Sequence, residues 1–259
     1  MSKFFNFITK DEHFGLRLIY FILRLFVIVV AIDQLRNRNY ENLFLCILTL
    51  ILFLVPSFIE RRIHIDIPDT LEVIILLFIF SAEILGEIQE YYILFPYWDT
   101  VLHTINGFLA AAIGFSLIDI LNKNDKFAIS LSPVFVALVA FCFSMTIGVL
   151  WEFFEFGIDQ LLGYDMQKDT FIHTINTVLL NPTGANVPVH VNIASIEVNG
   201  ETWSGYIDIG LYDTMMDLIV NFIGAAVFSV FGYFYIKHRG NGFFLKGIIP
   251  KLQTNSQSE

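Results

Sequence analysis

Six long apolar blocks dominate this sequence of 259 residues and limit what it can fold into. A helix rises about 1.5 Å per residue, so roughly 20 apolar residues cross the ~30 Å hydrocarbon core of a bilayer. The blocks run from Leu16 to Ile32, Leu43 to Ile59, Ile67 to Ile88, Trp98 to Leu121, Ser130 to Leu161 and Gly210 to Ile236. We therefore expect an all-α membrane protein, a bundle of six transmembrane helices.

The composition excludes several other classes of protein. Hydrophobic residues make up 56% of the chain and charged residues 15%, against about a half and a quarter in soluble globular domains. Acidic residues outnumber basic ones by 25 to 15, and the net charge of -10 argues against a nucleic-acid partner. Cys46 and Cys142 both lie inside apolar blocks, without the spacing of a metal site, so we interpret them as small core residues.

The positions of Lys and Arg predict the orientation, because these residues accumulate on the cytoplasmic side. With both termini cytoplasmic, 11 of the 15 basic residues lie inside and 3 lie outside, while Arg24 lies within the first block. We interpret Arg24 as reaching toward the cytoplasmic face, with an ion pair inside the bundle as the alternative. The sequence thus predicts a multi-pass protein of the plasma membrane.

One polar segment, Gly163 to Asp208, interrupts the apolar pattern and is expected outside the cytoplasm as a small cap. It begins with an apolar stretch, Asp169 to Ile175, that has a helix-capping pattern and is expected along the membrane surface. Further on, Asn199-Gly200 lies between alternating runs, the pattern of a β-hairpin. The predicted organisation is a transmembrane domain over residues 1–239, which includes the cap at 163–208, and a cytoplasmic tail over 240–259.

Acidic residues recur at the predicted outer ends of four spans. Within a span they are three or four residues apart, the spacing that places side chains on one helix face. Counting along each span puts them at a similar depth, so we expect them to converge. The predicted metal-binding set is Glu83, Glu87, Asp99, His103, Glu152, Glu155, Asp159, Asp213 and Asp217.

Such a cluster requires protons, a cation or water, because neighbouring carboxylates repel one another and burial disfavours their charge. Oxygen ligands with one imidazole favour Mg²⁺, Mn²⁺ or Ca²⁺ over zinc. In an enzyme, a metal-activated water would work with acid/base groups. The predicted catalytic residues are Asp99, His103, Glu152, Glu155, Asp213 and Asp217. The alternative interpretation is that these are ordinary solvated acids at helix ends.

Three short motifs carry a resemblance to a known family: Asp99-Thr100-Val101-Leu102-His103, Trp151-Glu152-Phe153-Phe154-Glu155, and Asp213-Thr214-Met215-Met216-Asp217. Their order and spacing resemble the YjdF-like bacterial inner-membrane proteins over residues 70–235, and more distantly the VanZ-like family. The resemblance implies a multi-pass fold and a recurring acid/His constellation. The VanZ-like family usually has Gln where this chain has Glu155, and an Arg that this chain lacks before its third motif.

Three classes of function remain open at this stage. The site could bind a divalent cation in an enzyme that acts on an envelope lipid or a lipid-linked headgroup. It could serve a small cation- or proton-coupled transporter, or the chain could be a non-catalytic envelope scaffold. A transporter needs a continuous polar path, and the inner halves of these spans offer only Asn106, Asp119 and Asn221, so the sequence slightly favours an enzyme. The expected partners are the bilayer and an envelope lipid or a cation.

Overall fold

A computed structural model of the chain describes residues 13–63, 65–122, 131–238, 248–249 and 251–252. Length and composition make five of its helical segments candidates to cross a membrane, which supports a mostly helical, multi-pass protein. These segments are α2 (Phe14–Arg36), a segment of two helices (Tyr40–Arg62), α7 (Trp98–Asn122), α8 (Pro133–Leu162) and α9 (Leu211–Lys237). They correspond to the first, second, fourth, fifth and sixth apolar blocks.

The second block bends because of a proline. Helix α3 (Tyr40–Leu52) ends just before α4 (Val55–Ile63), which carries Pro56 near its start. Proline has no N–H, and its ring clashes with the carbonyl four residues earlier, here that of Leu52. A straight helix over 43–59 is therefore replaced by two helices around a turn at residues 53–54.

The third block is helical but changes type halfway. Helix α5 (Asp69–Phe80) continues directly into a π-helix, η1 (Ser81–Ile88), and a short helix, α6 (Tyr91–Leu94), follows. Neither part reaches the length of a spanning α-helix by itself, so this block is not among the five candidate spans. Most π-helices are single-turn bulges inside α-helices, and they occur frequently at functional sites.

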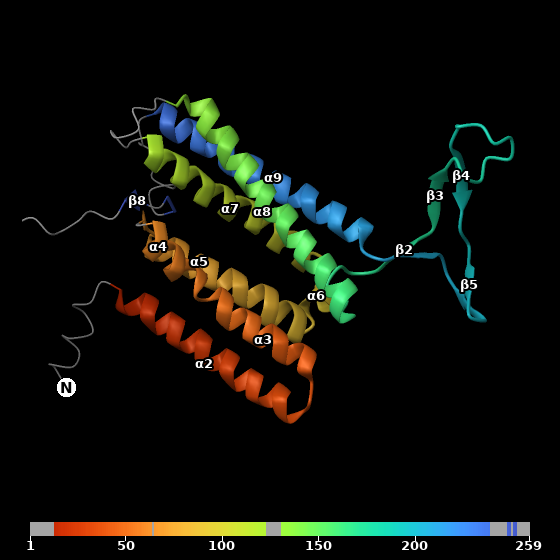
Figure 1. Ribbon diagram of the computed structural model, residues 1–259, viewed down its shortest axis with the longest axis horizontal. Helices are drawn as coiled ribbons and strands as arrows, with labels where there is room; N and C mark the ends of the chain where they lie inside the picture. Colours follow the sequence, from red (N-terminus) through yellow and green to blue (C-terminus); the bar gives the residue numbers. More distant parts are fainter. Residues whose placement is uncertain (1–12, 64, 123–130, 239–247, 250, 253–259) are drawn as a thin grey trace, which may run out of the picture. The chain divides into compact units, whose positions relative to one another are not determined.

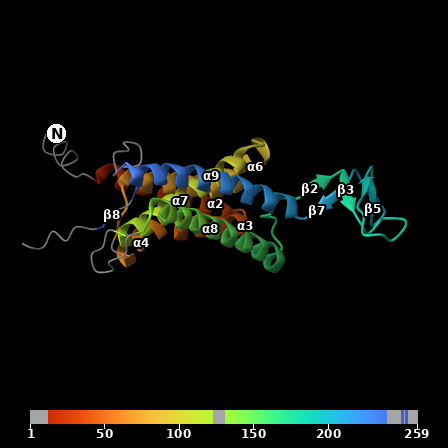
Figure 2. The same cartoon turned by 90° about the horizontal axis from the view of Figure 1, so that it is seen from above.

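The chain divides into two compact units, and the first contains residues 1–148 and 219–259. In it, α2, α3, α5 and α7 run side by side in both views (Figures 1 and 2). Val27, Cys46, Phe53 and Leu76 belong to one buried cluster between α2, α3 and α5. A second cluster joins α5, α7 and parts of α8 and α9, with Phe115 and Phe228 in edge-to-face contact.

Helices α7 and α9 approach each other closely at glycines, as the small residues in these blocks suggest. A Cβ atom on Gly107 would lie 2.1 Å from the carbonyl oxygen of Asn221. A Cβ on Gly224 would lie 2.0 Å from the carbonyl oxygen of Thr104. Only glycine allows the two backbones to lie this close.

The second unit, residues 149–218, contains the polar segment and short antiparallel strand pairs. Strand β2 (Thr170–Ile172) pairs with β7 (Tyr206–Asp208), β3 (Thr174–Thr177) with β4 (Val189–Asn192), and β5 (Ile196–Val198) with β6 (Glu201–Trp203). Asn199 and Gly200 link the last pair with φ angles of 53° and 88°. The stretch from Asp169 to Ile175 is not a capped surface helix, because its residues hydrogen-bond to other strands instead of to their own helix turn.

Little of the predicted tail at 240–259 can be compared with the structure. Strand β8 (Lys251–Leu252) pairs with β1 (Ile65–Asp66), while most of the remaining tail lies outside the described residues. Ile248 and Ile249 are buried in the second cluster of the first unit. Ile248 and Ile249 therefore pack against the helices.

Candidate functional site

In the first unit, a buried carboxylate lies on the π-helix. Glu83 is only 3% exposed, and its Oε2 atom has no hydrogen-bond partner among the described residues. Glu87, four residues later, is half-buried on the same element. An isolated carboxylate in an apolar interior is costly, so Glu83 requires a proton or a cation nearby.

The first turns of α7 carry the predicted Asp/His pair. Asp99 and His103 are one turn apart, and the Asp99 Oδ1 atom lies 3.4 Å from Nε2 of His103. His103 is buried, while Asp99 is partly exposed. The pair thus has one oxygen and one nitrogen ligand atom on a single helix face, a geometry that suits a cation or a proton transfer.

Helix α7 and the π-helix are joined at this end. The indole N–H of Trp98 donates a hydrogen bond of 3.2 Å to the carbonyl oxygen of Ser81. At the end of η1, the ring of Tyr92 packs against Gly86, where a Cβ atom would lie 2.3 Å from the ring. The segment that carries Glu83 and the helix that carries Asp99 and His103 are therefore neighbours.

Two asparagines lie further along the helices, and they bind each other. Asn106, three residues after His103, donates a 3.2 Å hydrogen bond from Nδ2 to Oδ1 of Asn221. Asn221 is fully buried, and its own Nδ2 lies 3.6 Å from the sulfur of Met145. Ser144 donates to the carbonyl oxygen of Gly107 at 2.7 Å. These polar groups serve helix packing.

In the second unit, several of the predicted acids hold the chain after α8. Asp159 accepts hydrogen bonds from the backbone N–H groups of Met166, at 2.7 Å, and Gln167, at 2.9 Å. Asp213 accepts one from the backbone N–H of Lys168 at 3.0 Å. These contacts give Asp159 and Asp213 a structural role; their predicted role as metal ligands stays a prediction.

The other predicted site acids of the second unit are buried. Glu155 accepts a 2.9 Å hydrogen bond from the indole N–H of Trp151, one turn earlier on α8. Glu152 and Asp217 are each 4% exposed. On α8, Phe153 and Phe156 are exposed, so Glu152 and Glu155 share the inward-facing side, as their spacing predicts. Whether all nine predicted ligands meet at one point stays a prediction.

Sequence reasoning missed a second group of polar residues in the first unit. Tyr20 on α2 donates a 2.5 Å hydrogen bond to Oε1 of Glu72 on α5. Arg24 lies one turn after Tyr20, with its guanidinium carbon 4.7 Å from the centre of the Tyr20 ring. The available signal was the presence of Arg24 and Glu72 in apolar blocks, since charged residues at membrane depth are often functional.

Comparison with known proteins supports the general class. An uncharacterised protein of Thermotoga maritima is 29% identical over 128 residues, which are 48% of this chain and 64% of the relative. The chain thus matches less than two thirds of that relative's length. No solved structure matches the chain.

A family profile gives a broader match, over residues 16–238. Its description names neither the YjdF-like nor the VanZ-like family, so that finer resemblance stays a prediction. The match covers all five candidate spans except the first residues of α2, and it includes every predicted site residue. The chain therefore belongs to the family described as "Predicted membrane protein (DUF2238)".

Proposed function

We propose that this membrane protein binds a divalent cation at the acidic end of its helices and uses it to act on an envelope lipid or a lipid-linked headgroup. The observation that carries the proposal is Glu83, a buried carboxylate with an unpaired oxygen on a π-helix next to the Asp99–His103 pair. A divalent cation would offset the cost of burying this charge.

The available ligand atoms determine which cation is expected. Asp99, Glu83 and Glu87 offer carboxylate oxygens, and His103 offers one imidazole nitrogen. Hard cations with oxygen ligands, Mg²⁺, Mn²⁺ and Ca²⁺, match this set, whereas structural zinc sites usually contain more nitrogen or sulfur. The sequence argument from helix depth adds Glu152, Glu155, Asp213 and Asp217 as predicted carboxylates.

The chemistry proposed for this site is metal-assisted attack by water. The cation would lower the pKa of a bound water and polarise the group under attack. His103, with Asp99 one turn away, is the group best suited to accept or return a proton. An enzyme is favoured over a transporter because Asn106 and Asn221, two of the three polar residues expected in the inner halves of the spans, bind each other.

The charge distribution supports the orientation proposed for the site. The predicted outer side carries most of the acidic excess, and the predicted inner side carries most Lys and Arg residues. We accordingly place both termini in the cytoplasm and the site at the outer face of the plasma membrane.

Metal binding can be tested on the purified full-length protein in a neutral detergent. Elemental analysis after equilibration with Mg²⁺, Mn²⁺ and Ca²⁺ is combined with thermal unfolding across a titration of each ion. We expect saturable binding of at least one ion with a rise in the unfolding midpoint.

Matched variants locate the site. Asp99→Asn and Glu83→Gln should weaken binding, since each removes one charge at nearly constant volume. Glu41→Gln removes an exposed acid from the first turn of α3 and should leave binding unchanged. The proposal is overturned if the parent protein binds no ion, or if Glu41→Gln reduces binding as much as the other two variants do.

A further inference from the structure

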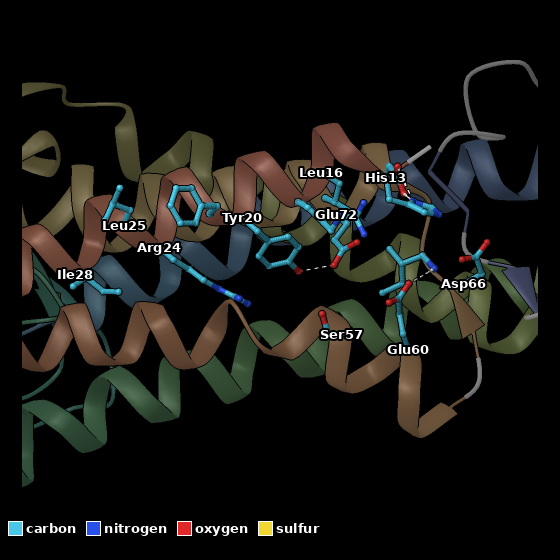
Figure 3. Close-up of a pocket in the computed structure, with 14 residues that line it drawn as sticks. His13, Leu16, Tyr20, Arg24, Leu25, Ile28, Ser57, Glu60, Asp66 and Glu72 are labelled. Atoms are coloured by element: carbon cyan, nitrogen blue, oxygen red, sulfur yellow. Dashed lines mark hydrogen bonds and ion pairs between the residues drawn. The ribbon is translucent and has the colours of Figure 1, made fainter. Parts of the chain in front are cut away.

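A pocket of about 580 Å³ lies in the first unit between α2, α4 and the start of α5, away from the Asp99–His103 pair. Figure 3 shows Tyr20 and Arg24 of α2, Ser57 and Glu60 of α4, and Glu72 of α5 around the same space. The volume is in the range of sites that bind small organic ligands. None of these residues takes part in the proposed cation site.

Two arginines of α2 line this pocket, Arg17 and Arg24, and Arg24 lies further from the start of the helix. Its guanidinium lies over the Tyr20 ring and reaches the carbonyl oxygen of Phe53 at 3.4 Å, a weak contact. It forms no ion pair with a carboxylate in the part of the chain that the structure describes. An arginine at membrane depth is costly without a counter-charge, so this pocket favours an anionic group beside Arg24.

Three of the four acids that line the pocket already have hydrogen-bond partners. Glu72 accepts the Tyr20 hydroxyl, and Asp69 lies 2.9 Å from Nδ1 of His13. Glu60 accepts the backbone N–H of Ile67 at 2.9 Å through Oε1. A carboxylate can accept several hydrogen bonds, so these acids can also receive a ligand ammonium group.

The apolar and charged groups of the pocket follow an order along α2 that is complementary to the parts of a lipid molecule. Leu25 and Ile28 line the apolar end of the pocket, and they are 49% and 44% exposed. Arg24 follows, and the acids Glu72 and Glu60 lie nearer the start of α2 (Figure 3). Asp66 and Asp69 also line this end, where the four acids outnumber Arg17 and His13, so the order is apolar, cationic and then net acidic. A lipid with a phosphate followed by an ammonium group has the complementary order of apolar tail, anion and cation.

The depth of Arg24 agrees with this arrangement. Arg24 is 10 residues from the first residue of α2, about 15 Å along the axis. Its side chain reaches back toward the helix start and meets the Tyr20 ring, about 6 Å closer to that end. The guanidinium is thus within reach of a lipid headgroup.

We propose that this pocket binds a phosphate–ammonium headgroup, with the phosphate on Arg24 and the ammonium on Glu60 and Glu72. Arginine pairs with phosphate through two parallel hydrogen bonds, and Ser57 offers a further hydroxyl donor on the opposite wall. The acyl chains lie against Leu25 and Ile28. Both a phospholipid and a soluble phosphoethanolamine present this headgroup chemistry.

The test uses the full-length protein in a neutral detergent and measures the thermal unfolding midpoint across ligand titrations. The probes are dioctanoyl phosphatidylethanolamine, dioctanoyl phosphatidic acid, dioctanoyl glycerol and O-phosphoethanolamine. We expect saturable stabilisation by phosphatidylethanolamine, weaker stabilisation by phosphatidic acid and none by the glycerol. Stabilisation by O-phosphoethanolamine at similar concentrations would identify the soluble compound as the ligand; equal stabilisation by the glycerol would overturn the proposal.

Variants separate the two charges of the headgroup. Arg24→Gln should weaken the binding of phosphatidylethanolamine about tenfold or more, because the charge-assisted hydrogen bonds to the phosphate are lost. Glu60→Gln keeps an oxygen that can accept the Ile67 N–H. It should weaken the binding of phosphatidylethanolamine but not that of phosphatidic acid, which has no ammonium group. Arg36→Gln, at the other end of α2, is the matched control and should bind normally.

Folding of the variants is checked by size-exclusion chromatography. If Arg24→Gln does not fold, Arg24→Lys and Ser57→Ala replace it, because lysine keeps the charge and alanine leaves α2 unchanged. Both variants should weaken the binding of phosphatidylethanolamine. If every folded variant binds as tightly as the parent protein, Arg24 serves only the carbonyl of Phe53 at the end of α3, and the proposal is wrong.

Discussion

The close approach of α7 and α9 in the first unit can be tested by adding a single methyl group. In Gly107→Ala, the new Cβ would lie 2.1 Å from the carbonyl oxygen of Asn221, whereas ordinary contacts begin at 3.4 Å. The obstacle is backbone, so no side chain can rotate out of the way. We expect α7 and α9 to move apart locally by about 1.3 Å.

The cost of this movement can be estimated from its parts. Overpacking a well-packed interface costs about 1–3 kcal/mol. The Asn106–Asn221 hydrogen bond, now 3.2 Å long, would be broken, which adds roughly 0.6–2 kcal/mol. The better helix propensity of alanine returns up to ~1 kcal/mol. The net loss in the free energy of unfolding is then about 0.6–5 kcal/mol, which lowers the folded-to-unfolded ratio by roughly threefold to a few thousand-fold.

The assay is unfolding by sodium dodecyl sulfate in mixed micelles, followed by far-UV circular dichroism. Gly157→Ala is the matched control, because a Cβ at this position in α8 meets no atom within 4 Å. It should be neutral or slightly stabilising. Gly224→Ala should resemble Gly107→Ala, and the double variant should lose less than the sum, since the first methyl already separates the helices. Unchanged stability in Gly107→Ala would refute the reasoning.

Three further predictions concern other contacts. In a double-mutant cycle, Asn106→Leu and Asn221→Leu should show a coupling of roughly 0.6–2 kcal/mol in the same unfolding assay, and a coupling near zero would contradict the hydrogen bond. Asp159→Ala should speed trypsin cleavage after Lys168, measured by mass spectrometry, because two backbone N–H groups lose their acceptor; Glu201→Ala, which removes an exposed acid from β6, should not. In a Cys142→Ser background, Glu197→Cys should react with a membrane-impermeant maleimide from outside intact cells, since Glu197 is exposed in the second unit. Labelling from the cytoplasmic side alone would reverse the proposed topology.

The apolar blocks predicted most of the helices because spanning segments have a strong and local signal. The break near Pro56 follows from a local rule too, because proline interrupts a helix. The π-helix at Ser81–Ile88 could not be predicted in this way, since the length and apolarity of a block do not distinguish a π-helix from an α-helix. The strands β2 and β3 were missed for a similar reason: their partners, β7 and β4, are distant in sequence.

The site was predictable only within each helix. Spacing placed Asp99 with His103, and Glu152 with Glu155, because residues three or four apart share a face. Spacing could not show that Asp159 binds the backbone of Met166 and Gln167, which depends on how the chain turns after α8. Nor could it reveal the pocket around Arg24, whose walls come from three separate helices.

The stability of the α7–α9 contact also distinguishes two versions of the cation site. The Asp99–His103 pair lies within one helix, and Glu83 lies on η1, which packs against α7. If these groups alone hold the ion, the folded fraction of Gly107→Ala should bind it with unchanged affinity, because moving α9 leaves α7 and η1 in contact. If Asp213 and Asp217 of α9 also bind the ion, its affinity should fall with the stability. Titration of the ion against folded Gly107→Ala, beside Gly157→Ala, therefore decides whether the predicted carboxylates of α9 belong to the site.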